Sequence, residues 1–591
     1  MSAVEHMERP ASLPRFRLGG SVLLLPVIAF LFVFFIYPVV SMLAISGVDN
    51  SGNVTLQFYQ QALTGRAFSV FLNTISISTW ITVITVLLSY PVAYYLANNK
   101  GRATNLILII VLLPFWTSVL VRAFAWMLLL GRNGVINSTM VDLGILEVPA
   151  DLLFNLFSVV LSSVHALMPV AVLSMLSTMQ NIDRNLHSAA ATLGAEPGDT
   201  FWRVFFPISF PGVASAALVT FIVSMGIFVQ PSLLGSPRET MIAQLIIQQI
   251  DELYNWGLAA AVSVMVLALS IVIIVIFDRA LGIATIAGSQ QSGGASGKAM
   301  RSITASLGTA TVAVHKAIRR ILPQRKSGEP PARWPLAVPT VLIVVFLAAP
   351  TFFLIPVSFT GSNFIEWPPR GYSLQWYEAY FTNPIWREAT VRSIVVGLIT
   401  AGFSVAIGVP AAFALTRSKF KGKGLVLPYI LLPLVAPNII VALALFYYFS
   451  KIGLVGTDIG LIIGHTVFAV PYVVLTMIAT LANYDQRLDH AAWTLGARPL
   501  TTFRLITLPL IKVGFMTSFL FAFVRSFDEV TVALFISPGL TTTLPKRMWT
   551  EAHHSVEPTL AAVSTILIVM VILVIVASEL LKRRDLGQKR A

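Results

Sequence analysis

Twelve apolar stretches, each long enough to cross a bilayer, follow one another along this chain. A spanning helix needs about 20 consecutive, mostly apolar residues. Of the 591 residues, 56% are hydrophobic and 11% are charged, whereas soluble domains carry roughly 25% charged residues. We therefore expect an all-α polytopic membrane protein. The predicted spans lie near 20–46, 68–97, 104–131, 153–179, 213–235, 257–278, 335–358, 391–416, 425–450, 460–482, 513–535 and 559–581.

The net charge of +14 comes from basic residues that gather in the tails and in short loops between the spans. This is the positive-inside pattern of a membrane protein, and it explains the charge without a nucleic acid partner. All of these loops fall on the cytoplasmic side when both termini are cytoplasmic. The cations are Arg9, Arg15, Arg17, Lys100, Arg102, Arg417, Lys419, Lys421, Lys423, Lys582, Arg583, Arg584, Lys589 and Arg590.

Two further features of the sequence bear on the first span and on possible chemistry. The first apolar run, 20–46, is too long for the core of a signal peptide, so we expect it to remain as the first spanning helix. The chain contains no cysteine, which excludes disulfides, thiolate metal sites and cysteine nucleophiles.

Two loops repeat the same residues at the same spacing, 302 positions apart. The first loop, near 181–212, and the second loop, near 484–511, each contain two alanines, then a glycine, a phenylalanine and a proline. Each half holds six predicted spans, and an even number makes the two repeats parallel. The repeated residues are Ala189, Ala190, Gly194, Phe201 and Pro207 in the first loop, and Ala491, Ala492, Gly496, Phe503 and Pro509 in the second.

The repeat divides the chain into a first half, 1–278, and a second half, 334–591, joined by a polar and basic linker, 279–333. Part of the linker is rich in serine and glycine, which predicts flexibility. Between 314 and 325, apolar and basic residues alternate. Two interpretations remain open for this segment: a short basic helix on the inner leaflet, or a disordered basic tether.

Each loop is predicted to hold a short helix that docks on a partner. The small alanine faces permit close approach, and the glycines allow the chain to turn where the helix ends. The prolines are expected to break the chain before it returns to the membrane. An ordinary helical hairpin would explain one such loop, but two loops at identical spacing favour a shared docking function.

These loops resemble the EAA motif of ABC-importer permeases. The usual glutamate before the alanines is Ser188 in the first loop and His490 in the second, which puts an ion pair from this position in doubt. In that family the loop forms the coupling helix that receives motion from an ATP-binding subunit. The resemblance therefore assigns a coupling role to the twelve loop residues named above.

The two halves resemble two different permeases of spermidine/putrescine importers. The first half carries segments 122–126 and 228–235, which look like the B-type permease. The second half carries segments 367–369, 526–529 and 543–545, which look like the C-type permease. The resemblance implies a type I importer in a bacterial inner membrane, with two ATP-binding subunits forming a homodimer and a periplasmic substrate-binding protein.

The chain is not expected to hydrolyse ATP or to bind a cofactor itself. Its nearest approach to a phosphate-binding loop, residues 293–299, lacks the first glycine and the final Ser or Thr. The resemblance places ATP and Mg²⁺ on the partner subunits. No metal-ligand motif or catalytic triad is apparent, so we expect no enzyme activity.

Charged residues within predicted spans mark a candidate substrate pathway, because they are costly in a bilayer. Asp528 and Glu529 are candidates to attract a cationic amine, with aromatic help from Trp126. The alternative, equally open, is that Arg525 neutralises one of these carboxylates on the same helix. The full candidate set is Arg122, Trp126, Ser224, Arg525, Ser526, Asp528 and Glu529.

The predicted function is the transmembrane permease of an ATP-driven importer for polyamine-like small molecules. An opine, an aminophosphonate or ferric iron are alternative substrates for an importer of the same type. A stand-alone secondary transporter is the alternative from another class, because parallel six-helix halves also suit it. His165 and His465 are expected to form hydrogen bonds between helices, and a role as gate residues is the alternative.

Overall fold

The computed structural model describes residues 20–281 and 334–588, except 50, 184, 196, 419, 538, 540–541 and 555–556. Within these residues all regular elements are helical, and the only β pairings are two isolated bridges. The expected all-α class is therefore confirmed. The predicted linker helix, the N-terminal arginines and the last two cations of the C-terminal tail lie outside the described residues.

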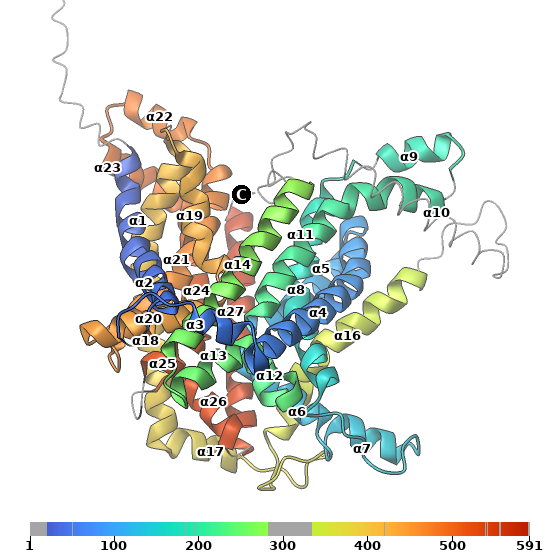
Figure 1. The fold of residues 1–591 in the computed structure, drawn as a ribbon. Helices are drawn as coiled ribbons and strands as arrows, with labels where there is room; N and C mark the ends of the chain where they lie inside the picture. Colours follow the sequence, from blue (N-terminus) through green and yellow to red (C-terminus); the bar gives the residue numbers. More distant parts are fainter. Residues whose placement is uncertain are drawn as a thin grey trace, which may run out of the picture. The chain divides into compact units, whose positions relative to one another are not determined.

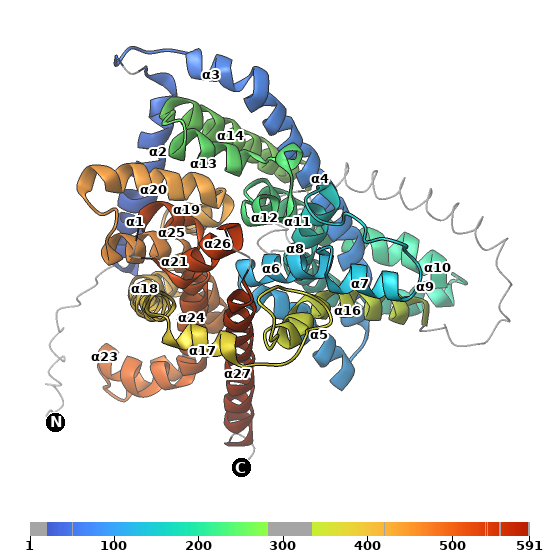
Figure 2. The same ribbon diagram turned by 90° about the horizontal axis from the view of Figure 1, so that it is seen from below.

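The first half begins with α1 (Leu25–Leu31) and α2 (Tyr37–Ala44), which a π-helical turn at Phe32–Ile36 joins. The following helices are α3 (Gln57–Ala62), α4 (Gly65–Asn98), α5 (Arg102–Trp116), α6 (Val119–Leu130), α7 (Val135–Asp142), α8 (Leu156–Gln180), α9 (Asn185–Thr192), α10 (Pro197–Thr200), α11 (Phe206–Met225), α12 (Val229–Leu234), α13 (Ile242–Asp251) and α14 (Trp256–Leu281). Helices α13 and α14 lie side by side (Figures 1 and 2).

The second half repeats this order, except that one helix, α16, stands where α1 and α2 do and that no described helix corresponds to α7. Its helices are α16 (Trp334–Val357), α17 (Gln375–Thr382), α18 (Pro384–Arg417), α19 (Lys423–Val435), α20 (Asn438–Ile452), α21 (Asp458–Ala482), α22 (Arg487–Thr494), α23 (Pro499–Thr502), α24 (Leu508–Phe527), α25 (Thr531–Ile536), α26 (Leu544–His554) and α27 (Thr559–Gln588). The bounds of α8, α9 and α11 recur in α21, α22 and α24 at the same offset of 302 as the loop residues. The repeat is thus structural as well as sequential.

Ten helices in the described part are long and apolar enough to cross a membrane, or eleven if one bent pair is a single span. That pair is α19 and α20, which meet at an angle of 93°. Pro437 precedes α20 with extended backbone, at φ −54° and ψ 128°, and this ends the helical path. The predicted span 425–450 is therefore not one continuous helix. The predicted span 104–131 is interrupted in the same way, because Thr117 and Ser118 leave the helical conformation between α5 and α6.

Two other spans begin and end earlier than predicted. The helical runs cover Gly198–Met225 and Pro499–Phe527, instead of 213–235 and 513–535. The first run ends at Gly226, where a side-chain Cβ would lie 3.1 Å from Cβ of Pro437. The short helices α12 and α25 follow after a break. Because the two runs begin at Gly198 and Pro499, the loops predicted near 181–212 and 484–511 contain more helix than expected.

The chain divides into two compact units that do not coincide with its halves. One unit holds the described residues up to Pro38 together with Ile394–Leu434 and Asp458–Glu529. The other unit holds Val39–Ser393, Val435–Thr457 and the described residues from Val530 onward. The first helix of each half therefore packs with helices of the opposite half.

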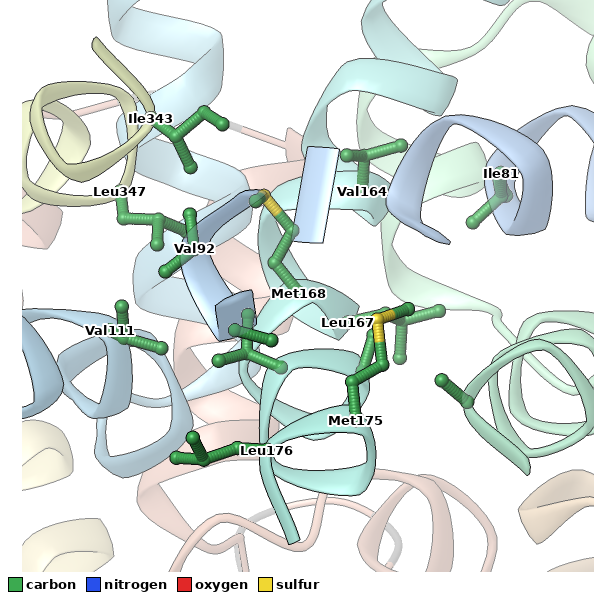
Figure 3. Close-up of a cluster of buried hydrophobic side chains, with 14 of the residues drawn as sticks. Ile81, Val92, Val111, Val164, Leu167, Met168, Met175, Leu176, Ile343 and Leu347 are labelled. Atoms are coloured by element: carbon green, nitrogen blue, oxygen red, sulfur yellow. The ribbon is translucent and has the colours of Figure 1, made fainter. Parts of the chain in front are cut away.

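Specific contacts show this exchange within each unit. Tyr429 of α19 donates its hydroxyl hydrogen to the carbonyl of Ile28 in α1, at 3.0 Å. In the other unit, Nε2 of His165 in α8 donates to the carbonyl of Leu347 in α16, at 3.1 Å. Leu347 belongs with Ile343 to the buried cluster around α4, α5 and α8 (Figure 3). His165 therefore acts between helices, as expected.

Glycines bring the central helices of each repeat close together. Gly212 of α11 lies against Thr178 of α8, and a Cβ on this glycine would lie 2.8 Å from Cβ of Thr178. The equivalent pair is Gly514 of α24 and Thr480 of α21, where the corresponding distance is 2.7 Å. Lipid tails are as apolar as leucine, so helices in a bilayer associate through close packing at small residues.

Candidate functional site

The helix of each loop presents its small residues on an exposed surface. Helices α9 and α10 connect α8 to α11 and lie at one end of them (Figure 1). Ser188 and Ala189 are exposed and Ala190 is half-buried. In the second loop, His490 and Ala491 are exposed, whereas Ala492 is buried.

Both loop helices end in the same hydrogen-bonded turn at glycine. Gly194 has φ +81° and Gly496 has φ +86°, the left-handed region that favours glycine. The N–H of Gly194 donates to the carbonyl of Ala191, and the next N–H donates to that of Ala190, both at 3.0 Å. The second loop makes the same two bonds. This is the Schellman motif, which satisfies the last carbonyls of a helix. The residues predicted to end each helix have the geometry to do so.

The expected chain break at Pro207 and Pro509 is absent. Phe201–Phe205 and Phe503–Thr507 form π-helical turns that run directly into α11 and α24. In the first loop, the N–H of Phe206 bonds to the carbonyl of Phe201, one residue farther back than in an α-helix. Each proline occupies the first turn of the α-helix that follows, where the lack of an N–H costs little. The π turn thus lets the proline remain within one continuous helical run.

Exposed apolar side chains flank the alanines of both loops. Leu193 and Leu495 occupy equivalent positions, and each is 88% exposed. Trp493 of the second loop is 45% exposed and meets the ring of His490 with centroids 5.1 Å apart. Each loop helix thus carries exposed apolar side chains beside its small residues.

The second loop is anchored by Asp489, which the sequence analysis did not single out. This carboxylate is 2% exposed. It accepts hydrogen bonds from Nη1 of Arg417 at 2.7 Å, from the hydroxyl of Tyr484 at 2.6 Å and from Oγ1 of Thr507 at 2.8 Å. Burial, and next the bond to Asp489, raise the pKa of Tyr484 above its usual range, so its hydroxyl remains a donor.

Arg417 reaches Asp489 from the end of α18 and is held by two rings. Its guanidinium carbon lies 4.8 Å from the ring centroid of Phe413 and 5.1 Å from that of Tyr484. The sequence showed Arg417 only as one of several loop cations. Its partner lies 72 positions later, so spacing offered no signal for this pair.

The candidate pathway residues of the second half form one polar cluster at the end of α24. Nη1 of Arg525 lies 2.5 Å from Oε2 of Glu529, and the Glu529 side chain is 2% exposed. Of the two readings left open by the sequence, the structure contains the ion pair. Asp528 and Glu529 do not lie inside a spanning helix as predicted, because α24 ends at Phe527 and both follow it.

Ser526 connects this cluster to α21. Its hydroxyl forms a 2.8 Å hydrogen bond with Nδ1 of His465, and both residues are buried. His465 thus acts between helices, as expected. Its Nε2 has no hydrogen-bond partner among the described residues.

The remaining candidates belong to the other compact unit. Arg122 is buried in α6, and its Nη1 donates to the carbonyl of Pro114, which the break after α5 leaves without a helical partner. Trp126 packs against the rings of His165 and Phe346, with centroids 5.6 and 5.5 Å away. The hydroxyl of Ser224 donates to the carbonyl of Phe221 in the same helix. Arg122 and Trp126 lie one turn apart in α6, whereas Ser224 lies in α11.

Comparison with known proteins agrees with this architecture. Residues 89–282 and 404–584 match the family described as "Binding-protein-dependent transport system inner membrane component". The chain belongs to this family. It contains the family domain twice, once in each half. The boundaries predicted for the two halves and the linker remain predictions.

Each of the similar curated proteins is about as long as one half of this chain. The chain is 29% identical over 260 residues to the spermidine/putrescine transport system permease protein PotB of Haemophilus influenzae, covering 43% of this chain and 91% of that protein. It is 30% identical over 245 residues to PotC of the same organism, covering 41% and 95%. PotC of Escherichia coli is 31% identical over 242 residues, covering 41% of this chain and 91% of that protein.

Two solved structures were also matched. One is a bacterial ABC transporter for import of the acidic polysaccharide alginate, at 16% identity and TM-score 0.34, covering 44% of this chain and 99% of that one. The other is the alginate transporter in complex with a pentasaccharide-bound periplasmic protein, at 16% identity and TM-score 0.39, covering 46% and 95%.

Family membership confirms the resemblance drawn from the motifs. The chain is a multi-pass inner-membrane permease in which B-type and C-type halves are fused, and it is a transport component rather than an enzyme. The roles of the individual loop and pathway residues remain predictions.

Proposed function

We propose that this chain forms the membrane passage of an ATP-driven importer for polyamine-like molecules. The single observation that carries the proposal is the pair of equivalent loops, each with exposed small and apolar residues on a helix closed by the same glycine turn. Two such surfaces suit a homodimeric ATP-binding partner, which would hold the ATP and Mg²⁺. Both termini are then cytoplasmic, as the basic loops require.

A periplasmic binding protein would deliver the substrate. Support comes from the family description, which names binding-protein-dependent transport. The polyamine assignment is supported by the names of PotB and PotC. Because Arg525 neutralises the buried carboxylate of Glu529, the cluster also suits a zwitterionic opine or aminophosphonate.

Transport measurement in proteoliposomes tests the proposal. The chain is reconstituted with an ATP-binding subunit and a periplasmic binding protein of the same importer type. Uptake of labelled spermidine, putrescine, an opine, an aminophosphonate and ferric iron is then compared with and without ATP. We expect ATP-dependent uptake of a polyamine. ATP-dependent uptake of only an anionic substrate or iron would overturn the substrate assignment. Uptake by the chain alone, without nucleotide, would favour the stand-alone secondary transporter.

Docking of the loops has a separate test. Ala491→Trp and Ala189→Trp each add a large side chain at an exposed, equivalent position. We expect either change to abolish stimulation of the partner's ATPase, because the bulky ring prevents close approach. Leu143→Trp, in a 69% exposed position beyond α7, is the matched control and should leave stimulation intact. Normal stimulation in both loop variants would contradict docking at these surfaces.

A further inference from the structure

The two loops share their backbone but differ in what anchors them. Four equivalent positions around the loop helix hold different residues. At an offset of 302, Asp489 corresponds to His187, Tyr484 to Ile182 and Thr507 to Phe205; at an offset of 319, Arg417 corresponds to Asn98. None of the polar anchors of the second loop has a counterpart in the first.

In the second loop, one carboxylate joins three separate elements. Arg417 comes from the end of α18, Tyr484 from the turn after α21, and Thr507 from the π turn before α24. These bonds are directional, and the one from Arg417 joins two charges. Hydrogen bonds to a charged group are roughly twice as strong as neutral ones. The position of α22 relative to α24 is therefore tightly specified.

In the first loop, rings replace the ionic network. His187 stacks on Phe205 with centroids 5.7 Å apart, and Phe205 meets Tyr94 edge-on at 4.8 Å. Asn98 does not reach the loop, since its side-chain amide bonds back to the carbonyl of Tyr94. Ring contacts tolerate small displacements that a three-bond carboxylate does not.

The helix that follows the second loop carries the polar cluster at its other end. Helix α24 runs from the π turn that contains Thr507 to Phe527, and Arg525 and Ser526 lie in its last turn. A displacement of the second loop is thus passed along one helix to the Arg525–Glu529 pair. The equivalent helix α11 ends at Gly226 without a charged residue in its last turn.

We propose that Asp489 is a positioning residue that holds the second loop more rigidly against its neighbouring helices than the first loop is held. Motion of the ATP-binding partner is then transmitted to the membrane helices chiefly through the second half. This inference rests on the proposed function, because it requires that a partner moves the loops. It adds that the two loops transmit motion unequally, although both would dock on identical partner subunits.

Spin labels test the mechanical claim directly. Because the chain has no cysteine, Leu495→Cys and Leu193→Cys each create a single labelling site, at equivalent positions of equal exposure. In the full chain without the ATP-binding partner, which would cover these positions, Asp489→Asn is expected to raise label mobility at position 495 and leave position 193 unchanged. His187→Ala is the matched variant and should leave position 495 unchanged. Equal mobility at 495 with and without Asp489→Asn would overturn the anchoring.

The functional claim is measured as substrate transported per ATP hydrolysed. This ratio does not depend on how much protein folds, because a loss of folded complex lowers both rates together. We expect Asp489→Asn to lower the ratio several-fold and His187→Ala to leave it unchanged. Thr507→Val, which removes one neutral donor and keeps the charge pair, should lower it less than Asp489→Asn.

The outcomes separate this inference from the proposed function. If the unmodified complex neither hydrolyses ATP in response to the binding protein nor transports, the proposed function fails. If the unmodified complex does both and Asp489→Asn keeps the same ratio, only the present inference fails. If Asp489→Asn and His187→Ala lower the ratio of transport to ATP hydrolysis equally, the two loops transmit motion equally, and the inference is also overturned.

Discussion

Replacement of Gly514 by alanine tests the packing on which the second half depends. Gly514 of α24 faces Thr480 of α21, and a Cβ at this position would lie 2.2 Å from Oγ1 and 2.7 Å from Cβ of Thr480. Ordinary contacts of a Cβ are 3.4 Å or longer. Thr480 is itself fixed, since its hydroxyl donates to the carbonyl of Thr476 at 2.9 Å. The two helices must therefore move apart by about an ångström to admit the methyl group.

Two opposing effects set the size of the change. Alanine favours a helix over glycine by about 0.5–1 kcal/mol, whereas an extra methyl group in a packed interface costs about 1–3 kcal/mol. The steric cost is larger, so we expect Gly514→Ala to lower the free energy of unfolding by about 1–2 kcal/mol. Gly212→Ala should act in the same direction but less strongly, because a Cβ at this position would lie 2.8 Å from Oγ1 of Thr178 in the other unit.

Equilibrium unfolding of the purified chain in detergent measures this effect. Gly402→Ala is the matched control, because Gly402 lies in α18 with open space around its Cβ position. There only the helix preference acts, so the variant should gain about 0.5–1 kcal/mol. A Gly514→Ala variant as stable as Gly402→Ala would refute the reasoning.

Two further changes test the polar contacts. Arg525→Gln should lower the free energy of unfolding by about 3–5 kcal/mol, because it leaves the buried Glu529 carboxylate without its partner, and the double change Arg525→Gln with Glu529→Gln should recover most of that loss in the same detergent titration. Asn137→Ala should cost about 1–3 kcal/mol, because its buried side chain bonds the carbonyls of Gly131 and Ala150 and the N–H of Ala150. Faster amide exchange confined to residues 131–150 is the expected readout, and unchanged exchange there would contradict it.

Hydropathy located the spans well but not their interruptions. The prediction at 425–450 treated as one helix what Pro437 divides into α19 and α20. A window of about 20 residues averages over a single proline, and proline is also found inside continuous helices of this chain, such as Pro169 in α8. Whether a proline bends or ends a helix depends on how neighbouring groups satisfy the backbone around it. At the break after α5, for example, Arg122 donates to the carbonyl of Pro114, which lies within the last turn of that helix.

The loops show the same limit at the level of single residues. Their repeated spacing was sufficient to predict a short helix closed by Gly194 and Gly496, because helix ends depend on local backbone geometry. The anchors Asp489 and Arg417 were not predicted, because their contact joins the ends of segments far apart in the sequence. The prolines were predicted to break the chain, and the preceding π turn removed the need for a break.

The sequence by itself determined that this protein is helical, crosses the membrane many times and consists of two parallel copies of one permease domain. These properties follow from the apolar length of each segment and from the spacing of residues within it, because a bilayer forces every backbone group to bond inside its own helix. The tertiary structure decided which helix of one half packs with the other half, that Arg525 pairs with Glu529, and that a buried carboxylate anchors the second loop, whereas the described residues of the first loop pack through rings. These depend on how side chains from distant segments meet, and close packing between helices selects one arrangement among many that the same apolar pattern permits.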